Sequence, residues 1–390
     1  MGGKAVNKLS QLLRNRAIST DEYKMKKMYL ICFGIIIALT TLGDTTFWMP
    51  PRIPLRIIWL CELIIAYKIF FVDFWLYDEK KEYIMCLLIT VAIFIFSKYT
   101  LPLEIMALVL GARGVSFDKI LKIWLIISAI IISAAYISSV LGIIEDIKYE
   151  AGEITRHSLG IIYPTNFGGH VFFIMAASTY FLNKNKIIWP VCLFLPLIAS
   201  VYYYSHARLA VGGMILLILG YFILHIGKLE KNNQISILLR YFTKCSIIGI
   251  PFICFTVSIL YTPENNLLVQ LDNWLSGRVN LSHTGLVDYA ITLFGQKIEF
   301  VTFGSPKLLE GVPYFYIDSS YIKIFMLYGI SGFLLFQMLF YKMYRRLCKN
   351  QWLTYLLFVI AVNGAIDSFI YQVQYCPFLL SAYAVINDDI

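Results

Sequence analysis

The sequence predicts an all-α polytopic membrane protein with about twelve transmembrane helices, and three observations support this prediction. Of 390 residues, 59% are apolar and only 15% are charged, and the mean hydropathy is +0.71. The chain also holds 7 Trp, 27 Tyr and 28 Phe residues, a load that suits aromatic belts at membrane interfaces. Finally, apolar runs follow one another along the whole chain. A soluble globule and a disordered chain are both excluded, because soluble domains are only roughly 45–50% apolar.

The first 27 residues form a basic segment ahead of the first apolar run and lack a small-residue cleavage site. We therefore expect a cytoplasmic basic tail over residues 1–27 and no cleaved signal peptide. A bilayer core about 30 Å thick needs roughly 20 helical residues. The predicted spans are residues 28–43, 54–72, 83–98, 100–111, 120–142, 162–182, 187–204, 207–227, 245–261, 319–341, 351–366 and 369–386.

The distribution of Lys and Arg orients these spans. With both termini in the cytoplasm, 22 basic residues fall on the cytoplasmic side and 9 on the outer side, while Lys68 and Lys323 lie within spans. The run 100–111 is short, but leaving it out reverses this bias, so we keep it as a short or tilted crossing. Residues 28–386 then form a single membrane domain with two long outer loops, 143–162 and 262–317. The second loop is apolar enough to form short interfacial helices.

The net charge of +9 has an explanation in this topology, because cytoplasmic loops of membrane proteins collect Lys and Arg. We expect no nucleic-acid partner. The eight cysteines include no CxxC pair, so we expect neither a disulfide framework nor a zinc site. The lipid bilayer is the first partner that the sequence predicts.

Three arginines lie in outer segments, where topology gives no reason for them. Arg156 is in the first long loop, Arg208 follows a tight turn, and Arg278 follows Gly277 in the second long loop. A guanidinium presents a planar fork of donors that matches phosphate oxygens, and it keeps its charge in a partly desolvated site. Each arginine alone could instead extend along the interface, cap loop carboxylates or stay solvated. Three together favour an anion site.

Further polar residues gather at the same outer face. They are Glu145 in the first loop, Tyr163, Asn166 and His170 at the start of the sixth span, and His206 in the turn before Arg208. The alternative for Asn166 and His170 is a hydrogen bond between helices.

Asp318 and Ser319 stand at the top of the tenth span. Either residue could simply cap that helix, since Asp and Ser are both favoured at helix N-termini. Asp318 is also a carboxylate beside a cationic region, where it could accept a proton from a sugar hydroxyl.

The order of these motifs carries a resemblance. They are Arg156-His-Ser-Leu-Gly160 with Tyr163-Pro-Thr-Asn166, Leu275-Ser-Gly-Arg278 with Leu293-Phe-Gly-Gln296, and Asp318-Ser-Ser-Tyr321 with Tyr328-Gly-Ile330. The chain resembles the Wzy-type polysaccharide polymerases, above all those of Gram-positive capsule and exopolysaccharide loci. The wider O-antigen polymerase family includes ligases, which have a histidine where this chain has Asp318, and this difference favours a polymerase.

The resemblance implies a GT-C-like membrane glycosyltransferase that joins oligosaccharide repeat units carried on undecaprenyl diphosphate at the outer face of the plasma membrane. Donor and acceptor are both lipid-linked, and neither a metal nor another cofactor is expected. A flippase and a chain-length regulator are further partners to consider.

Residue types then suggest roles. Arg156, Arg208 and Arg278 would stabilise the diphosphate leaving group, while Asn166, Tyr163 and Ser319 would contact substrate. Asp318 is the first candidate base, followed by His206, His170 and Glu145.

The main alternative is a lipid-linked oligosaccharide flippase or another polytopic transporter, and a membrane scaffold is a third reading. Transporters place polar sites near the bilayer midplane and often use inverted repeats. Here the polar groups crowd the outer mouth of the spans instead, which favours the enzyme.

Overall fold

The computed structural model describes residues 2–50, 52–77, 79–151, 154–181, 188–226, 233–303, 305, 308, 310–349 and 351–386, without the side chains of residues 2–21, 151, 188–193, 225–226 and 233. The described chain is mainly helical, as expected of an all-α membrane protein. Four helices are long and apolar enough to cross a membrane, namely Glu22–Gly43, Phe117–Val140, Gln234–Leu260 and Ser320–Leu347.

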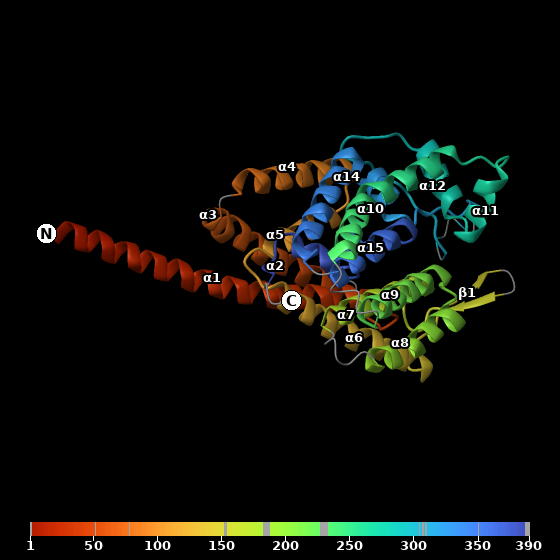
Figure 1. Ribbon diagram of the computed structural model, residues 1–390, viewed down its shortest axis with the longest axis horizontal. Helices are drawn as coiled ribbons and strands as arrows, with labels where there is room; N and C mark the ends of the chain where they lie inside the picture. Colours follow the sequence, from red (N-terminus) through yellow and green to blue (C-terminus); the bar gives the residue numbers. More distant parts are fainter. Residues whose placement is uncertain are drawn as a thin grey trace.

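Helices occupy each predicted span except the last, within the described residues. They are α1 (Gly2–Gly43), α2 (Ile53–Tyr67) with a π-helix (Lys68–Asp73) and α3 (Phe74–Leu76), α4 (Lys80–Ser97), α5 (Leu101–Gly111), α6 (Phe117–Val140), α7 (Pro164–Phe181), α8 (Ile188–Ser200) with a second π-helix (Val201–Ser205), α9 (Arg208–Ile226), α10 (Asn233–Leu260), α14 (Ser320–Leu347) and α15 (Gln351–Ile366). The predicted basic tail is continuous with α1, whose N-terminal part extends away from the bundle (Figure 1).

The chain passes back and forth between two ends of the bundle. At one end, the Tyr163 hydroxyl donates to the Phe303 carbonyl oxygen over 2.9 Å. This end carries the hairpin of β1 (Lys148–Ala151) and β2 (Ile154–His157), together with α11 (Asn266–Trp274) and α12 (Arg278–Asp288), at the right of Figure 1, and we call it the loop end. At the other end, which we call the opposite end, the Phe117 amide donates to the Val385 carbonyl oxygen over 2.8 Å.

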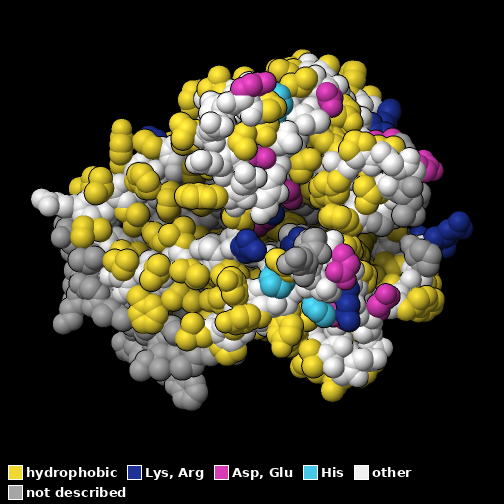
Figure 2. All heavy atoms as spheres, turned by 90° about the vertical axis from the view of Figure 1, so that its right-hand side faces the viewer, with side chains coloured by type: hydrophobic (Ala, Val, Ile, Leu, Met, Phe, Trp, Pro, Cys, Tyr) yellow, Lys and Arg dark blue, Asp and Glu magenta, His cyan; other side chains and the backbone are white. Residues whose placement is uncertain are grey.

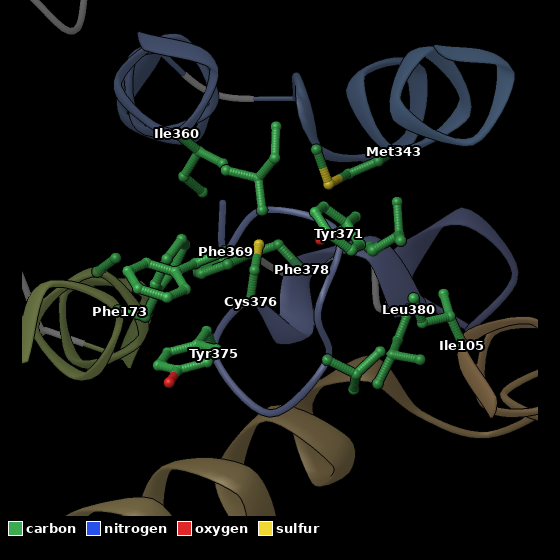
Figure 3. Close-up of a cluster of buried hydrophobic side chains, with 14 of the residues drawn as sticks. Ile105, Phe173, Met343, Ile360, Phe369, Tyr371, Tyr375, Cys376, Phe378 and Leu380 are labelled. Atoms are coloured by element: carbon green, nitrogen blue, oxygen red, sulfur yellow. The ribbon is translucent and has the colours of Figure 1, made fainter. Parts of the chain in front are cut away.

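The prediction of a helical span over residues 369–386 is wrong. This segment consists of turns and a short 3-10 helix, Pro377–Ala382. Figure 3 shows it winding between helices, with Phe173, Met343 and Ile360 around it. An apolar run predicts burial, not helix, and irregular backbone is tolerated at membrane depth where protein covers it. The segment still reaches the opposite end, where Arg346 donates to the Ala384 carbonyl oxygen over 2.6 Å.

The loop over residues 143–162 departs from the all-α prediction. Strands β1 (Lys148–Ala151) and β2 (Ile154–His157) pair antiparallel, with Lys148 opposite His157. Tyr, Ile and Thr in this loop favour a pleated backbone, a preference that the overall hydropathy concealed. In the second loop, α11 (Asn266–Trp274) and α12 (Arg278–Asp288) are short helices, as expected.

Two glycines join the second loop to α14. Gly329 interrupts α14 with φ 72°, and Gly295 has φ 91°. A Cβ on Gly295 would lie 2.1 Å from the Leu327 carbonyl oxygen, so only glycine permits this approach. The Ile330 amide then donates to the Thr292 carbonyl oxygen over 3.0 Å. The motifs Leu293-Phe-Gly-Gln296 and Tyr328-Gly-Ile330 therefore meet through their backbones.

Candidate functional site

Arg278 is the first residue of α12, and its place is fixed by local structure. Gly277 before it adopts a left-handed conformation with φ 82°. Asp272 caps the helix, because its Oδ1 accepts from the Val279 amide over 2.8 Å and from the Asn280 amide over 3.0 Å. The side chain of Arg278 is thereby directed from a rigid helix start and not from a flexible loop.

Arg278 lies between two carboxylates from different elements. Its Nε is 3.3 Å from Oδ2 of Asp318, and its Nη2 is 3.4 Å from Oδ1 of Asp367. The guanidinium side chain is only 13% exposed. Its Nη1 is buried and has no hydrogen-bond partner among the described residues. A buried charged donor without an acceptor is costly, so this nitrogen is available for an anionic ligand.

Asp367 is a site residue that the sequence reasoning missed. It lies in the turn after α15 and is 4% exposed. The Ser320 hydroxyl donates to its carbonyl oxygen over 2.6 Å, and Asn363 Nδ2 lies 3.4 Å from Oδ2 of its carboxylate. The available signal was a single carboxylate placed between the last two apolar runs, where a charge needs a partner.

The charged groups in this cluster shift one another's pKa values. Burial raises the pKa of Asp367 to about 6, and the charge of Asp318 adds to this effect, while Arg278 opposes it. Burial disfavours the charged form of Arg278, but Asp318 and Asp367 outweigh it and raise its pKa. The guanidinium therefore keeps its charge although it is largely removed from water.

Arg156 and Arg208 lie beside this cluster. Arg156 is half-buried on β2, and its Nε donates over 3.1 Å to the carbonyl oxygen of Ser205, the last residue of the π-helix that precedes the exposed Arg208. Burial lowers the pKa of Arg156, and the charges of Arg278 and Arg208 lower it further. We call Arg156, Arg208, Arg278, Asp318 and Asp367 the arginine site. Figure 2 shows this end of the molecule, where charged and histidine side chains surround a hollow.

Aromatic side chains border the arginine site and join the two long loops. The rings of Tyr149 and Tyr163 stack at 5.4 Å, and those of Phe303 and Tyr314 lie 4.9 Å apart. Burial, together with the charge of Asp318, raises the pKa of Tyr314. Tyr163, predicted as a substrate contact, thus lies at this aromatic border, and such faces are suited to contact with sugar rings.

His170 belongs to a different cluster. It is fully buried, its Nε2 lies 3.2 Å from Oδ2 of Asp44, and its ring stacks on Tyr375 at 4.2 Å. The Tyr375 hydroxyl and Gln374 Nε2 also donate to Asp44 Oδ2, over 2.6 and 3.0 Å. The geometry therefore favours the alternative for His170, a hydrogen bond that joins two elements of the bundle.

The remaining predicted site residues range from exposed to buried. Glu145 is exposed, and its carboxylate has no hydrogen bond or ion pair to the described residues. His206 is half-buried with φ 49°, next to Ser205. Asn166 is half-buried in the first turn of α7. Ser319 is the N-cap residue of α14, but its side chain makes no capping hydrogen bond, so the capping alternative does not account for it.

Metal ligation finds no support in the described ranges, where no group of three or more His, Cys, Asp or Glu side chains could hold an ion. No family model, curated protein or solved structure matches the chain. The function must therefore be argued from the chemistry of the arginine site.

Proposed function

We propose that the chain is a membrane glycosyltransferase that polymerises undecaprenyl-diphosphate-linked oligosaccharide repeat units at the outer face of the plasma membrane. One observation carries the proposal. Arg278 is held between two carboxylates with one buried nitrogen left without a partner, and Arg156 and Arg208 lie close by.

The leaving group of this reaction explains the arginines. When the bond between the anomeric carbon and the phosphate oxygen breaks, negative charge develops on the diphosphate. Fixed cations stabilise that charge without a proton donor, and their effect is largest where water is excluded. Arg278 meets this condition because Asp318 and Asp367 orient it and burial shields it.

The acceptor needs a base. As a sugar hydroxyl oxygen attacks the anomeric carbon, its proton passes to a carboxylate, a step that contributes typically 10²–10⁴-fold to the rate. The side chain of Asp318 is 20% exposed, whereas that of Asp367 is 5% exposed. We therefore assign the base to Asp318, which a hydroxyl can reach, and the positioning of Arg278 to Asp367.

The test is conversion of purified lipid-linked repeat units by the purified protein in detergent or nanodiscs. We expect a ladder of polymers and release of one undecaprenyl diphosphate for each linkage formed. Repeat units recovered unchanged, from protein that remains folded, would contradict the proposal.

A transporter is the second candidate, favoured by the irregular, buried segment that follows α15, since transporters bind cargo at broken helices. Proteoliposomes separate the two functions. Transfer of lipid-linked repeat units between leaflets without any polymer would favour the transporter, whereas polymer formation in detergent, where no second leaflet exists, would favour the enzyme.

A further inference from the structure

The hairpin that carries Arg156 is a weak element, and it holds Arg156 against like charges. Strands β1 and β2 pair over only four positions, and a two-stranded hairpin is marginally stable on its own. Arg156 is repelled by the charges of Arg278 and Arg208. Its Nε donates to the Ser205 carbonyl oxygen, a neutral acceptor, and no carboxylate pairs with it among the described residues. The place of Arg156 in the arginine site therefore depends on what fixes the hairpin.

An aspartate–histidine pair closes the open end of this hairpin. Asp146 Oδ2 lies 2.5 Å from Nδ1 of His157, the residue that follows Arg156 on β2. The other carboxylate oxygen, Asp146 Oδ1, accepts from the Leu159 amide over 2.8 Å. One carboxylate just before β1 thus holds both the last residue of β2 and the chain beyond it. Because His157 adjoins Arg156, this contact also fixes the backbone from which the arginine side chain starts.

The pair is open to protons from solvent, since the side chains of His157 and Asp146 are 30% and 23% exposed. A histidine changes its charge between about pH 5 and 8. The charged and titratable groups around His157 in the described structure are Asp146, the exposed Lys148 opposite it on β1, Arg156 beside it on β2, and Tyr204 of the π-helix, 6.2 Å between ring centroids. Only Asp146 bonds the imidazole. Protonation turns this hydrogen bond into an ion pair, which is the stronger contact.

We propose that Asp146 and His157 are positioning residues, whose pair keeps the hairpin closed and thereby holds Arg156 beside the other two arginines. When the pair is broken, repulsion moves Arg156 out of the arginine site, and the affinity of the site for phosphate groups falls. The inference rests on the proposed function for the use of Arg156 as a phosphate ligand. Binding of an anion can nevertheless be measured without polymerisation.

The experiment is a double-mutant cycle on the full chain in nanodiscs, with the Kd for inorganic pyrophosphate as the readout. Asp146→Ala should raise this Kd about tenfold, because a charge-assisted hydrogen bond from Arg156 to the anion is lost. Arg156→Ala should raise it at least as much. In the Arg156→Ala protein, Asp146→Ala should cause no further change, since no arginine remains to be positioned. The matched control is Glu150→Ala, which removes an exposed carboxylate that bonds Thr155 elsewhere on the same hairpin, and it should leave the Kd unchanged.

The histidine supplies a second readout, the dependence of binding on pH. His157→Asn keeps an N–H donor near the position of Nδ1 but cannot be protonated. Relative to wild type at the same pH, it should bind pyrophosphate equally well at pH 8 and up to about fivefold more weakly at pH 5.5, where wild type has gained the ion pair. His157→Leu should weaken binding at both pH values, and it replaces Asp146→Ala in the cycle if that variant does not fold.

Three results would overturn the inference. They are a Kd unchanged by Asp146→Ala or His157→Leu, an equal loss of affinity with and without Arg156, and a ratio of the His157→Asn and wild-type Kd values that is the same at both pH values. Wild type that binds no pyrophosphate would overturn it as well, because Arg156 would then serve no anion site. Coupling between the pair and Arg156 in a protein that never polymerises would remove the proposed function and leave this inference in place.

Discussion

The two ends of the bundle use buried charges in different ways. At the opposite end, Lys68 is 1% exposed, and its Nζ lies 2.5 Å from Asp73 Oδ2 and 2.9 Å from each of the carbonyl oxygens of Gly111 and Arg113. All three of its donors are thus satisfied by the protein itself. This lysine joins the π-helix after α2 to the end of α5, a structural role.

At the loop end, Arg278 is only partly satisfied. Arg278 has five N–H donors in all, yet its two ion pairs are long, at 3.3 and 3.4 Å, and Nη1 has no described acceptor. Burial alone therefore does not identify a functional charge. A ligand site differs from a structural ion pair in the number of N–H donors that have no acceptor in the protein.

Lys68→Met should cause the largest effect and should act on stability. The substitution leaves Asp73, 2% exposed, without its cation, and breaking a buried pair costs typically 3–5 kcal/mol. The measurement is thermal or denaturant unfolding in detergent, together with the Kd for undecaprenyl diphosphate of the protein that remains folded. Lys68→Met combined with Asp73→Leu should recover most of the loss. If Lys68→Met alone were as stable as wild type, the contrast between the two ends would be removed.

Arg278→Lys should show the reverse pattern, with a smaller loss of stability than Lys68→Met and a loss of polymerisation on the order of 10²–10³-fold. An ammonium keeps the charge but cannot contact two carboxylates and a phosphate oxygen from one planar group. The rate of polymer formation from purified lipid-linked units measures the effect, with Lys297→Ala as a control that should keep the wild-type rate. Arg156→Lys should behave similarly. Ladders of normal length and rate from both lysine variants would exclude these arginines from the mechanism.

Asp367 should give stability a particular pH dependence. Its pKa is about 6 in the folded protein against 3.8 as the reference value, so the folded state keeps this proton over roughly pH 4 to 6. The free energy of unfolding should therefore fall as the pH rises through this window, by roughly 3 kcal/mol in total. Unfolding curves of wild type and Asp367→Asn, subtracted at each pH, isolate this contribution. A difference that is flat across the window, or that has the opposite sign, would contradict the assignment.

Asp318→Asn should have the smallest of these effects, a decrease in rate of about 10²-fold, or about 2.7 kcal/mol. Asparagine keeps the shape of the side chain but cannot take the proton of the acceptor hydroxyl. Single-turnover polymerisation gives the rate, and binding of undecaprenyl diphosphate verifies that the site is intact. Near-normal turnover would assign Asp318 to positioning alone and direct the search for the base to His206 and Glu145.

Local patterns in the sequence were sufficient to predict a helical, apolar bundle with two long loops. Apolar runs and turn residues are local signals, and they were sufficient to predict α1, α6, α10 and α14 and the short helices of the second long loop. The sequence also singled out the three arginines, because Lys and Arg collect on the cytoplasmic side and these three lie in predicted outer segments. The twelve crossings and their orientation remain predictions.

Which charged groups meet depends on the tertiary structure. Asp367 became the partner of Arg278 because the end of α15 packs beside the start of α14, where Ser320 holds the Asp367 carbonyl oxygen. His170 likewise contacts Asp44, 126 positions away in the sequence, because the start of α7 packs beside the end of α1. Hydropathy also could not distinguish a buried helix from the irregular segment after residue 366, since both are apolar and only neighbouring helices can shield such a backbone. Ion pairs depend on distances between elements, and a sequence pattern contains no such distances.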